Sequence, residues 1–440
     1  MSAPPRTSHA PRADGNTVAS SGTWRAMDRA HVWHPYTQHA IAPEPIPVVR
    51  AEGAYLHTAD GRVILDAISS WWVTLHGHAH PAIARAVAEQ VATLEQVIFA
   101  GFTHEPAARL AAELVRVLPA GLERVFFSDD GSTAVEVALK MALQYWSNRG
   151  EERPLIAALE HAYHGDTFGA MSASGRGLFT DPFGTHLFEV ARLPDPSEHD
   201  VLPAFDTLVE TRGRELAAVI VEPLLLGAGG MRMWNAGTLA ALAARAREAG
   251  ILFIADEVLT GFGRTGPLFA CEHARVTPDI ICLSKGLTGG ALPLGATVAR
   301  EEIFRSFLSD DRRRTLFHGH SFTANPVTCA AARASLALLD DASRERRAAI
   351  ERAQRAALSA LASHPRVSNT RVLGTVAALD LDAGGGYLAD VGTRLAAFAM
   401  HEDVLLRPLG NVVYVLPPYC TTEADIARAW DVVRGFLDQA

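Results

Sequence analysis

Residues 251–257 are Ile-Leu-Phe-Ile-Ala-Asp-Glu, and residues 279–286 are Asp-Ile-Ile-Cys-Leu-Ser-Lys-Gly. In each stretch an apolar run leads to a charged group, which predicts a buried strand with Asp256 at the tip of the first and Lys285 at the tip of the second. Strand tips of one parallel sheet meet at the same edge, so the two side chains can face each other across a small flat ligand. Most lysines lie on the surface and many aspartates cap helices or form salt bridges. The prediction of a ligand site here therefore depends on Asp256 and Lys285 occurring together, because neither residue alone would indicate one.

The chain around these two stretches alternates between short apolar runs and helical stretches from about residue 80 to 330. This alternation is typical of a mostly parallel α/β sheet with helices on both faces. We expect strands at 125–128, 155–159, 218–221, 251–255 and 280–283, and helices at 81–97, 133–146 and 239–248.

A smaller α+β domain is expected after about residue 330. It contains two Ala- and Arg-rich helices (326–339 and 344–361), strands near 372–381, 404–407 and 412–416, and a last helix at 423–437. The predicted divisions are a disordered tail (1–22), an N-terminal segment that completes the small domain (23–75), a large domain (76–325) and the C-terminal small domain (326–440).

Composition excludes several classes of protein. The 440 residues suffice for one large and one smaller domain, and a net charge of −9 argues against a general nucleic-acid binder. No apolar stretch is long enough for a membrane span, and residues 1–22 lack the apolar core of a signal peptide. The four cysteines lie far apart, which favours reduced thiols and a cytoplasmic location, with a degenerate organelle presequence as the alternative.

A second candidate element is Phe126-Phe-Ser-Asp-Asp-Gly-Ser-Thr133. A strand, a glycine turn, hydroxyl groups and a helix start can bind a phosphate group through backbone N–H groups at Gly131 and Ser132. We expect Ser132 or Thr133 to open the helix, with Glu136 in the capping-box position. A plain capped helix is the alternative explanation.

Two further motifs are weaker. Gly261-Phe-Gly-Arg-Thr-Gly266 fits the dinucleotide pattern G-x-G-x-x-G, but Pro267 follows and no helical pattern begins there, so a nicotinamide dehydrogenase is not expected. Histidines cluster at 76, 78 and 80 and at 318 and 320 without a cysteine or carboxylate at ligand spacing. We therefore expect loop histidines and no metal site.

The strand-tip pair matches the requirements of pyridoxal phosphate (PLP), which needs a carboxylate to keep its ring nitrogen protonated and an amine to form an imine. The stretch 255–266 (ADEVLTGFGRTG), followed by Ser284-Lys285-Gly286, resembles the signature of the class III, or ω-, aminotransferases of the PLP fold-type I superfamily. The resemblance implies a large domain with a mostly parallel seven-stranded sheet and a smaller α+β domain. It also implies that Lys285 binds PLP as a Schiff base and that Asp256 contacts the ring nitrogen.

Further residues carry roles that the same resemblance implies. Gly131 and Ser132 match the phosphate-binding turn, and Tyr163 matches an aromatic residue that stacks on the cofactor ring. A loop from a neighbouring subunit, matching residues 319–321, would complete the site in a homodimer. In that loop His320 and Ser321 are expected to contact the cofactor and Gly319 the substrate.

Three segments resemble the branch of the family that serves biotin biosynthesis: 33–38 (WHPYTQ), 66–72 (DAISSWW), and Arg407-Pro408 with 416–419 (LPPY). This implies S-adenosylmethionine as amino donor and 8-amino-7-oxononanoate as acceptor. Tyr36, Trp71, Tyr163 and Lys285 would contact the substrate, and Arg407 would bind the carboxylate of the oxononanoate. Another ω-aminotransferase, with lysine or a β- or ω-amino acid as donor, remains the alternative.

Four positions differ from the pattern of relatives. Asp130 stands where serine is common, and His320-Ser321 where Pro-Thr is common. Relatives that use glutamate as donor carry a second glutamate, which neutralises the carboxylate-binding arginine in one half-reaction. Ala228 occupies that position here, which favours a donor other than glutamate.

Overall fold

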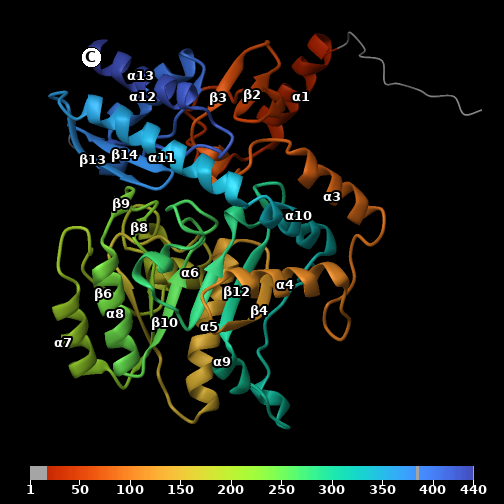
Figure 1. Ribbon diagram of the computed structural model, residues 1–440, viewed down its shortest axis with the longest axis vertical. Helices are drawn as coiled ribbons and strands as arrows, with labels where there is room; N and C mark the ends of the chain where they lie inside the picture. The colour runs from red at the N-terminus through yellow and green to blue at the C-terminus, as the bar shows by residue number, and fades with distance from the viewer. Residues whose placement is uncertain (1–16, 383–385, 440) are drawn as a thin grey trace, which may run out of the picture.

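A seven-stranded sheet forms the centre of the larger part of the molecule (Figure 1). Its strand order is β4 (Leu122–Ser128), β12 (Gly295–Arg300), β11 (Ile280–Leu283), β10 (Leu252–Asp256), β7 (Leu216–Val221), β5 (Leu155–Leu159) and β6 (Val190–Leu193). Every neighbouring pair is parallel except the two that β12 makes. The computed structural model describes residues 17–382 and 386–439. The predicted mostly parallel seven-stranded sheet is confirmed.

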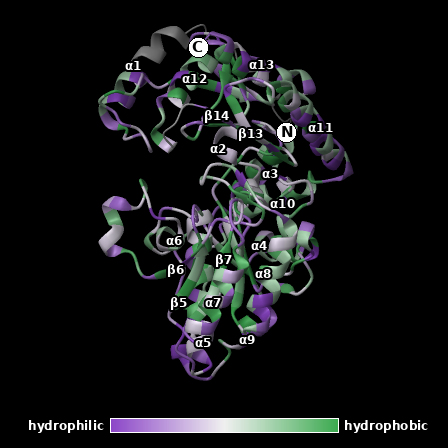
Figure 2. Cartoon of the chain, turned by 90° about the vertical axis from the view of Figure 1, so that its left-hand side faces the viewer, coloured by the Kyte–Doolittle hydropathy of each residue, from purple (hydrophilic) through white to green (hydrophobic). Residues whose placement is uncertain are grey.

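Helices cover both faces of this sheet because its strands alternate between two apolar surfaces. Ile156, Ile220 and Ile254 pack against α5 (Gly131–Asn148) on one face. The intervening residues of the same strands pack on the other face against α7 (Leu202–Arg212) and α8 (Ala236–Glu248). Figure 2 shows hydrophobic residues along β5 and β7 and hydrophilic ones on the outer helix α11 (Asp341–Leu361).

The smaller part joins the two ends of the described chain. Strands β1 (Val48–Glu52), β2 (Tyr55–Thr58) and β3 (Val63–Asp66) form a sheet with β15 (Val404–Leu405), which pairs in parallel with β3. A second sheet contains β13 (Val367–Leu373), β14 (Val376–Leu381) and β16 (Val412–Val415). Helices α11, α12 (Asp390–His401) and α13 (Glu423–Gln439) pack around these sheets, whereas α10 (Pro326–Ala337) packs against α3 (Pro81–Val91) and α4 (Glu105–Val117). The domain boundaries at 75/76 and 325/326 remain predictions.

Three sequence predictions were wrong in detail. Helix α1 spans Thr17–His31, so the predicted tail fails at 17–22, while residues 1–16 lie outside the described part. Helix α3 (Pro81–Val91) ends six residues before the predicted end at residue 97. The strand expected at 372–381 is the hairpin β13–β14, which turns at Gly374 with a φ of +57°. In the described residues, no helix is both long and apolar enough to cross a bilayer.

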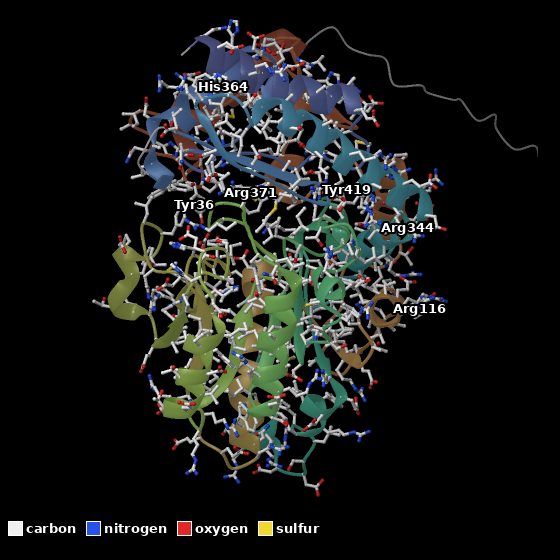
Figure 3. The ribbon with its side chains drawn as sticks, turned by 60° about the vertical axis from the view of Figure 1, so that its left-hand side comes forward. Tyr36, Arg116, Arg344, His364, Arg371 and Tyr419 are labelled. Atoms are coloured by element: carbon white, nitrogen blue, oxygen red, sulfur yellow. The ribbon has the colours of Figure 1, made fainter. Side chains whose placement is uncertain are left out.

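The two parts meet along a boundary at which Tyr36, Arg371 and Tyr419 lie (Figure 3). Arg371, from β13, donates to the carbonyl oxygens of Gly230 and Met231 in the larger part. The carboxyl edge of the seven-stranded sheet faces this boundary, so side chains at the strand tips are sheltered there.

Candidate active site

Asp256 and Lys285 lie at neighbouring strand tips of one sheet. Strands β10 and β11 pair in parallel with Asp256 opposite Cys282, and Lys285 lies just beyond the end of β11. Both side chains line one cavity of about 660 Å³. The structure thus brings together the acid and the amine that the sequence predicted to face each other.

The Asp256 carboxylate is held in a fixed orientation. His164 Nδ1 lies 2.7 Å from Oδ2, and the backbone N–H of Val258 donates to Oδ1 over 3.1 Å. Both Asp256 and His164 are buried. A proton on Nδ1 makes the imidazole a donor to Asp256, and such outer partners fix both the orientation and the charge of the acid.

Lys285 lies in surroundings that favour the loss of its proton. Burial lowers the pKa of its ammonium group, and the negative charges of Asp256 and Glu222 oppose that shift. Lys285 Nζ lies 5.0 Å from the centroid of the Trp72 ring. The backbone of Lys285 has a φ of +42°, which is uncommon for a residue with a side chain and typical of functional sites.

The start of α5 opens into the same cavity, which Asp129, Asp130, Gly131 and Ser132 line. A Cβ added at Gly131 would lie 2.6 Å from Val258 Cγ1, so any larger residue would have to displace the Val258 side chain. Asp130, and not Ser132 or Thr133, is the N-cap. Its side chain accepts from the backbone N–H of Thr133, which points this carboxylate at its own helix.

Glu136 does not form the predicted capping box with the start of α5. Its Oε1 accepts from the backbone N–H groups of Gly169 and Ala170 and from Thr167 Oγ1. Glu136 therefore caps α6 (Phe168–Ala173), and the capping box of α5 is made by Asp130 and Thr133.

A second cavity of about 270 Å³ adjoins the first, and Lys285, Trp72 and Tyr163 line both. Its walls are mostly aromatic, and Arg407 also lines it: the guanidinium carbon lies 4.3 Å from the centroid of the Trp71 ring. Among the described residues, Arg407 has no carboxylate partner within ion-pair distance. An uncompensated arginine in an aromatic pocket is suited to bind a carboxylate.

Tyr36, from the segment after α1, reaches this cavity through hydrogen bonds. Its hydroxyl donates to Asp166 Oδ2 over 2.5 Å and lies 3.3 Å from the Tyr163 hydroxyl. Burial, and then the Asp166 hydrogen bond, raise the pKa of Tyr36 to about 12. Burial also raises the pKa of Tyr163. Both phenols therefore stay protonated and serve as hydrogen-bonding groups.

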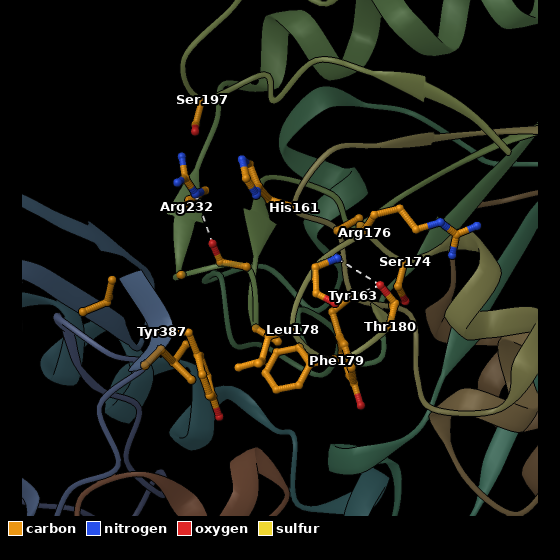
Figure 4. Close-up of a pocket in the computed structure, with 18 of the residues that line it drawn as sticks. His161, Tyr163, Ser174, Arg176, Leu178, Phe179, Thr180, Ser197, Arg232 and Tyr387 are labelled. Atoms are coloured by element: carbon orange, nitrogen blue, oxygen red, sulfur yellow. Dashed lines mark hydrogen bonds between the residues drawn. The ribbon is translucent and has the colours of Figure 1, made fainter. Parts of the chain in front are cut away.

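A third cleft, of about 470 Å³, continues outward from the aromatic cavity past Phe179 and Tyr387 (Figure 4). It contains Arg232, whose guanidinium pairs with Asp195 and Glu198 and donates to the carbonyl of Gly229. Arg232 and Glu198, which both line this cleft, thus pair with each other.

Gly319, His320 and Ser321 do not line any of these cavities in the single chain. They belong to an exposed loop in which His320 Nε2 lies 3.3 Å from Asp129 Oδ1. Gln96 Nε2 donates to the carbonyl of Ser321. The loop therefore lies beside the start of α5 but outside the cavity of its own chain.

Several residues of the site were missed from sequence. Glu222 follows strand β7, accepts from the backbone N–H groups of Tyr163 and Gly227, and has its pKa raised to about 7 by burial. Its sequence signal is the same as that of Asp256, a carboxylate after an apolar run. His164, Asp166 and Trp72 sit directly beside predicted residues but carry no distinct pattern of their own.

The weaker motifs have packing roles. A Cβ at Gly263 would lie 2.2 Å from Arg347 Nη1, so the glycine leaves room for a side chain of α11. His76 is buried, with Nε2 3.1 Å from Ser335 Oγ, and His78 Nε2 lies 2.8 Å from Asp66 Oδ2.

Comparisons with known proteins agree with this geometry. The chain matches the family model described as aminotransferase class-III over residues 36–437. It is 53% identical to the adenosylmethionine-8-amino-7-oxononanoate aminotransferase of Synechococcus elongatus, covering 93% of this chain and 99% of that protein. The crystal structure of the Methanocaldococcus jannaschii protein of the same name matches with a TM-score of 0.92 and 34% identity, covering 95% of this chain and 99% of that one.

An amine transaminase from an uncultivated Pseudomonas species, solved in its PLP-bound form, matches with a TM-score of 0.85 and 29% identity, covering 93% of this chain and 98% of that one. The fold, the family match and the relatives thus agree with the class that the sequence motifs predicted. The chain belongs to the class III aminotransferases, enzymes that use pyridoxal phosphate to transfer amino groups.

Proposed function

We propose that this enzyme transfers an amino group from S-adenosylmethionine to 8-amino-7-oxononanoate, giving 7,8-diaminononanoate for biotin biosynthesis. The observation that carries the proposal is Arg407, a partly buried cation in the aromatic cavity that adjoins Lys285. An arginine there can bind the terminal carboxylate of the oxononanoate, while its apolar chain lies against Tyr36 and Trp71. The names of the relatives support the same reaction.

The residues of the larger cavity fit pyridoxal phosphate. Asp256 offers an oriented carboxylate for a protonated ring nitrogen, and Lys285 offers an amine of lowered pKa. Gly131 and Ser132 lie in the first turn of α5, where backbone N–H groups have no partner within the helix and can bind a phosphate. When bound, the cofactor supplies a carbonyl carbon that exchanges amino groups and an electron-poor ring that takes up the electron pair of a broken C–H bond.

The chain itself binds, orients and moves protons. The amine of Lys285 would hold the cofactor, and as a free amine it would be the base that removes the proton from the substrate Cα. Asp256, oriented by His164, would accept from the ring nitrogen of the bound cofactor and so favour the protonated ring. Tyr36, Tyr163 and Asp166 form one wall of the cavity, and Trp72 encloses the amine from the other direction.

The donor is tested by two half-reactions on the yellow protein. S-adenosylmethionine alone should remove the visible absorbance of the bound cofactor, and 8-amino-7-oxononanoate should then restore it, with 7,8-diaminononanoate detected by mass spectrometry. Lysine, β-alanine and 4-aminobutyrate are the comparison donors. Bleaching by one of these, and not by S-adenosylmethionine, would assign another ω-aminotransferase reaction.

The acceptor is tested through Arg407. Replacing Arg407 with Ala should raise the KM for 8-amino-7-oxononanoate at least about tenfold, because a charge-assisted bidentate contact is lost. Arg394→Ala, which removes an exposed arginine paired with Asp390 on α12, is the control and should leave that KM unchanged. An unchanged KM in the Arg407 variant would contradict the proposed carboxylate contact.

We also propose that the enzyme is a cytoplasmic homodimer whose subunits share active sites. The exposed loop of residues 319–321 carries groups suited to a phosphate and a substrate, yet does not line the cavity of its own chain. Ile98, Phe102 and Phe322 are 60% exposed or more, and segments 95–96 and 321–325 are hydrogen-bonded to each other. Large apolar side chains exposed on and beside these segments favour association with a second copy. Cys271, Cys282 and Cys329 are buried free thiols, which suits a reducing compartment.

A further inference from the structure

The turn that carries Trp71 and Trp72 has a strained backbone. Ser69, Ser70 and Trp72 have φ values of +54°, +61° and +67°. Ser70 combines its φ with a ψ of −99°, outside the left-handed helical region that L residues can adopt. Each such conformation costs free energy and persists only where the surroundings impose it. Three of them within four residues require a specific restraint.

Asp66, at the end of strand β3, supplies that restraint. Its carboxylate is fully buried, and it accepts from the backbone N–H of Ile68 over 3.1 Å and from that of Ser70 over 2.6 Å. His78 Nε2 lies 2.8 Å from the oxygen that accepts from Ser70. The carboxylate thus uses both oxygens to fix the inside of the turn, and one imidazole fixes the carboxylate.

Other contacts hold the residues on either side of Ser70: the backbone N–H of Trp72 donates to the carbonyl of Ile68, and that of Val73 donates to the carbonyl of Ser69. Ser69 Oγ donates to the carbonyl of Leu416, and Leu416 N–H donates to the carbonyl of Ala67. Arg264 donates to the carbonyl of Trp72. Among the described residues, Asp66 alone accepts from the backbone N–H of Ser70, the residue with the most unusual backbone angles.

The turn carries two indoles, those of Trp71 and Trp72, and both line the aromatic cavity. Trp71 packs against the Arg407 guanidinium at 4.3 Å and edge-on to Tyr36 with ring centroids 5.4 Å apart. Trp72 donates from Nε1 to the Tyr414 hydroxyl and faces Lys285 Nζ at 5.0 Å. Trp71 directly follows Ser70, so a relaxed turn would move its ring, whereas the hydrogen bond to the buried Tyr414 holds the Trp72 ring in place.

We infer that Asp66, held by His78, is a positioning residue that sets the place of Trp71 beside Arg407 and thereby the affinity for the carboxylate-bearing substrate. Asp66 lines none of the three cavities and acts through the turn. Only the identity of the substrate rests on the proposed function; the class III aminotransferase activity does not.

The test is steady-state kinetics of Asp66→Asn. An amide has one oxygen to accept from two N–H groups and brings an NH2 group into a site built of donors, so the turn loses a contact. The KM for 8-amino-7-oxononanoate should rise about tenfold or more, the loss expected for a broken buried hydrogen bond to a charged group, while kcat changes less than about threefold. A role in folding alone would lower the amount of active enzyme and leave KM unchanged, and that outcome overturns the inference.

Asp195→Asn is the matched control. Asp195 is buried to the same extent as Asp66. It accepts from Arg232 and from the backbone N–H of Ser197, but it forms no hydrogen bond or ion pair with residues 66–72. It should lower thermal stability without a change in KM. If the wild-type enzyme does not convert the oxononanoate at all, the proposed function fails and the inference is tested on the substrate found instead.

Two further measurements keep the test decisive if Asp66→Asn does not fold. His78→Ala should raise the same KM, and His78→Gln, whose amide can still donate to Asp66, should restore it. In a Trp71→Ala background, loss of His78 should add little to the KM, because the effect travels through that ring. Additive effects in this cycle would contradict positioning through Trp71.

Discussion

Lys140 and Lys285 are the only two lysines among the 440 residues. Lys140 Nζ donates to the carbonyl of Phe317 over 2.8 Å and lies 3.2 Å from His318 Nδ1. Lys285 lines the large cavity, and burial lowers the pKa of its amine. Lys285 is therefore the one side-chain amine whose position in the cavity and lowered pKa both suit it to react with a carbonyl compound.

Lys285→Ala is expected to abolish the visible absorbance that PLP gains from its covalent link, and to lower turnover at least about 1000-fold, because nucleophile and base are lost together. Absorbance spectra after reconstitution and the half-reaction rates measure this. The control variant Lys140→Ala should keep both the visible absorbance and the turnover. Borohydride reduction followed by peptide mapping must label Lys285; a label at Lys140 would contradict the assignment.

Glu222 gives the protein a predictable pH dependence. Burial raises its pKa to about 7 in the folded state, above the ordinary 4.5. The folded chain then holds more protons than the unfolded chain, so this residue lowers the free energy of unfolding as pH rises from about 4.5 to about 7, by up to about 3 kcal/mol. Glu222→Gln removes this slope.

Urea denaturation of the cofactor-free protein between about pH 5 and pH 8 tests this expectation. Relative to wild type, Glu222→Gln should become steadily more stable as pH rises, on top of a pH-independent cost because an amide cannot accept from both Tyr163 and Gly227. Glu89→Gln, at an exposed position of α3, is the control, and its free energy of unfolding should change with pH in the same way as that of wild type. A difference that does not vary with pH would mean that Glu222 is ionised throughout.

At the scale of elements, the central strands could be predicted because apolar runs of four to six residues stand between turn residues. Ends of elements were less predictable. Residues 129–132 are four consecutive residues that can cap a helix, and only the three-dimensional path of the chain selects Asp130. The hairpin at Gly374 was hidden because apolar residues stand on both sides of its two-residue turn.

Asp130 affects both the stability of α5 and the binding of the cofactor phosphate. Asp130→Asn keeps the cap but removes a negative charge beside the first turn, so it should bind PLP several-fold more tightly. Asp130→Ala removes the cap as well and should lower the free energy of unfolding by about 1 kcal/mol. Cofactor titration and thermal unfolding measure the two effects. Weaker PLP binding by the Asn variant would show that the carboxylate assists the site.

The turn of the β13–β14 hairpin presses against the larger part of the molecule. A Cβ at Gly374 would lie 2.4 Å from the carbonyl carbon of Thr265, and φ there is +57°. Gly374→Ala should therefore cost more than about 2 kcal/mol of unfolding free energy. Gly250, with a φ of +63° and open space around it, is the matched control. Its Ala variant should lose only about 1 kcal/mol for backbone strain, and an equal loss in both would remove the packing argument.

On the scale of the whole molecule, the architecture followed from the alternating pattern together with the family motif. The residues that line the aromatic cavity could not be predicted from the local sequence pattern. Tyr36, Trp71 and Arg407 come from distant parts of the chain, and the pairing of β3 with β15 that brings the last two together leaves no local signal. They were predicted by resemblance alone, and their roles stay predictions.

The shared active site is tested with mixed subunits. Lys285→Ala lacks its own amine, and Ser321→Asp would place a carboxylate in the site of its partner, so each should be inactive alone. Random mixing should restore about a quarter of wild-type activity, since half of the dimers are hybrids with one intact site each. Hybrid formation is verified with two affinity tags. No recovery in verified hybrids would mean that residues 319–321 act within their own subunit.

The scarcity of lysine has a practical consequence for anyone who handles the enzyme. Glutaraldehyde, succinimidyl dyes and epoxide resins depend on surface amines, and here one of the two ε-amines is enclosed at the catalytic centre while the other is engaged by a neighbouring loop. Such reagents will give sparse, nearly uniform labelling through the α-amino group, and immobilisation will need thiol, carboxylate or affinity chemistry instead.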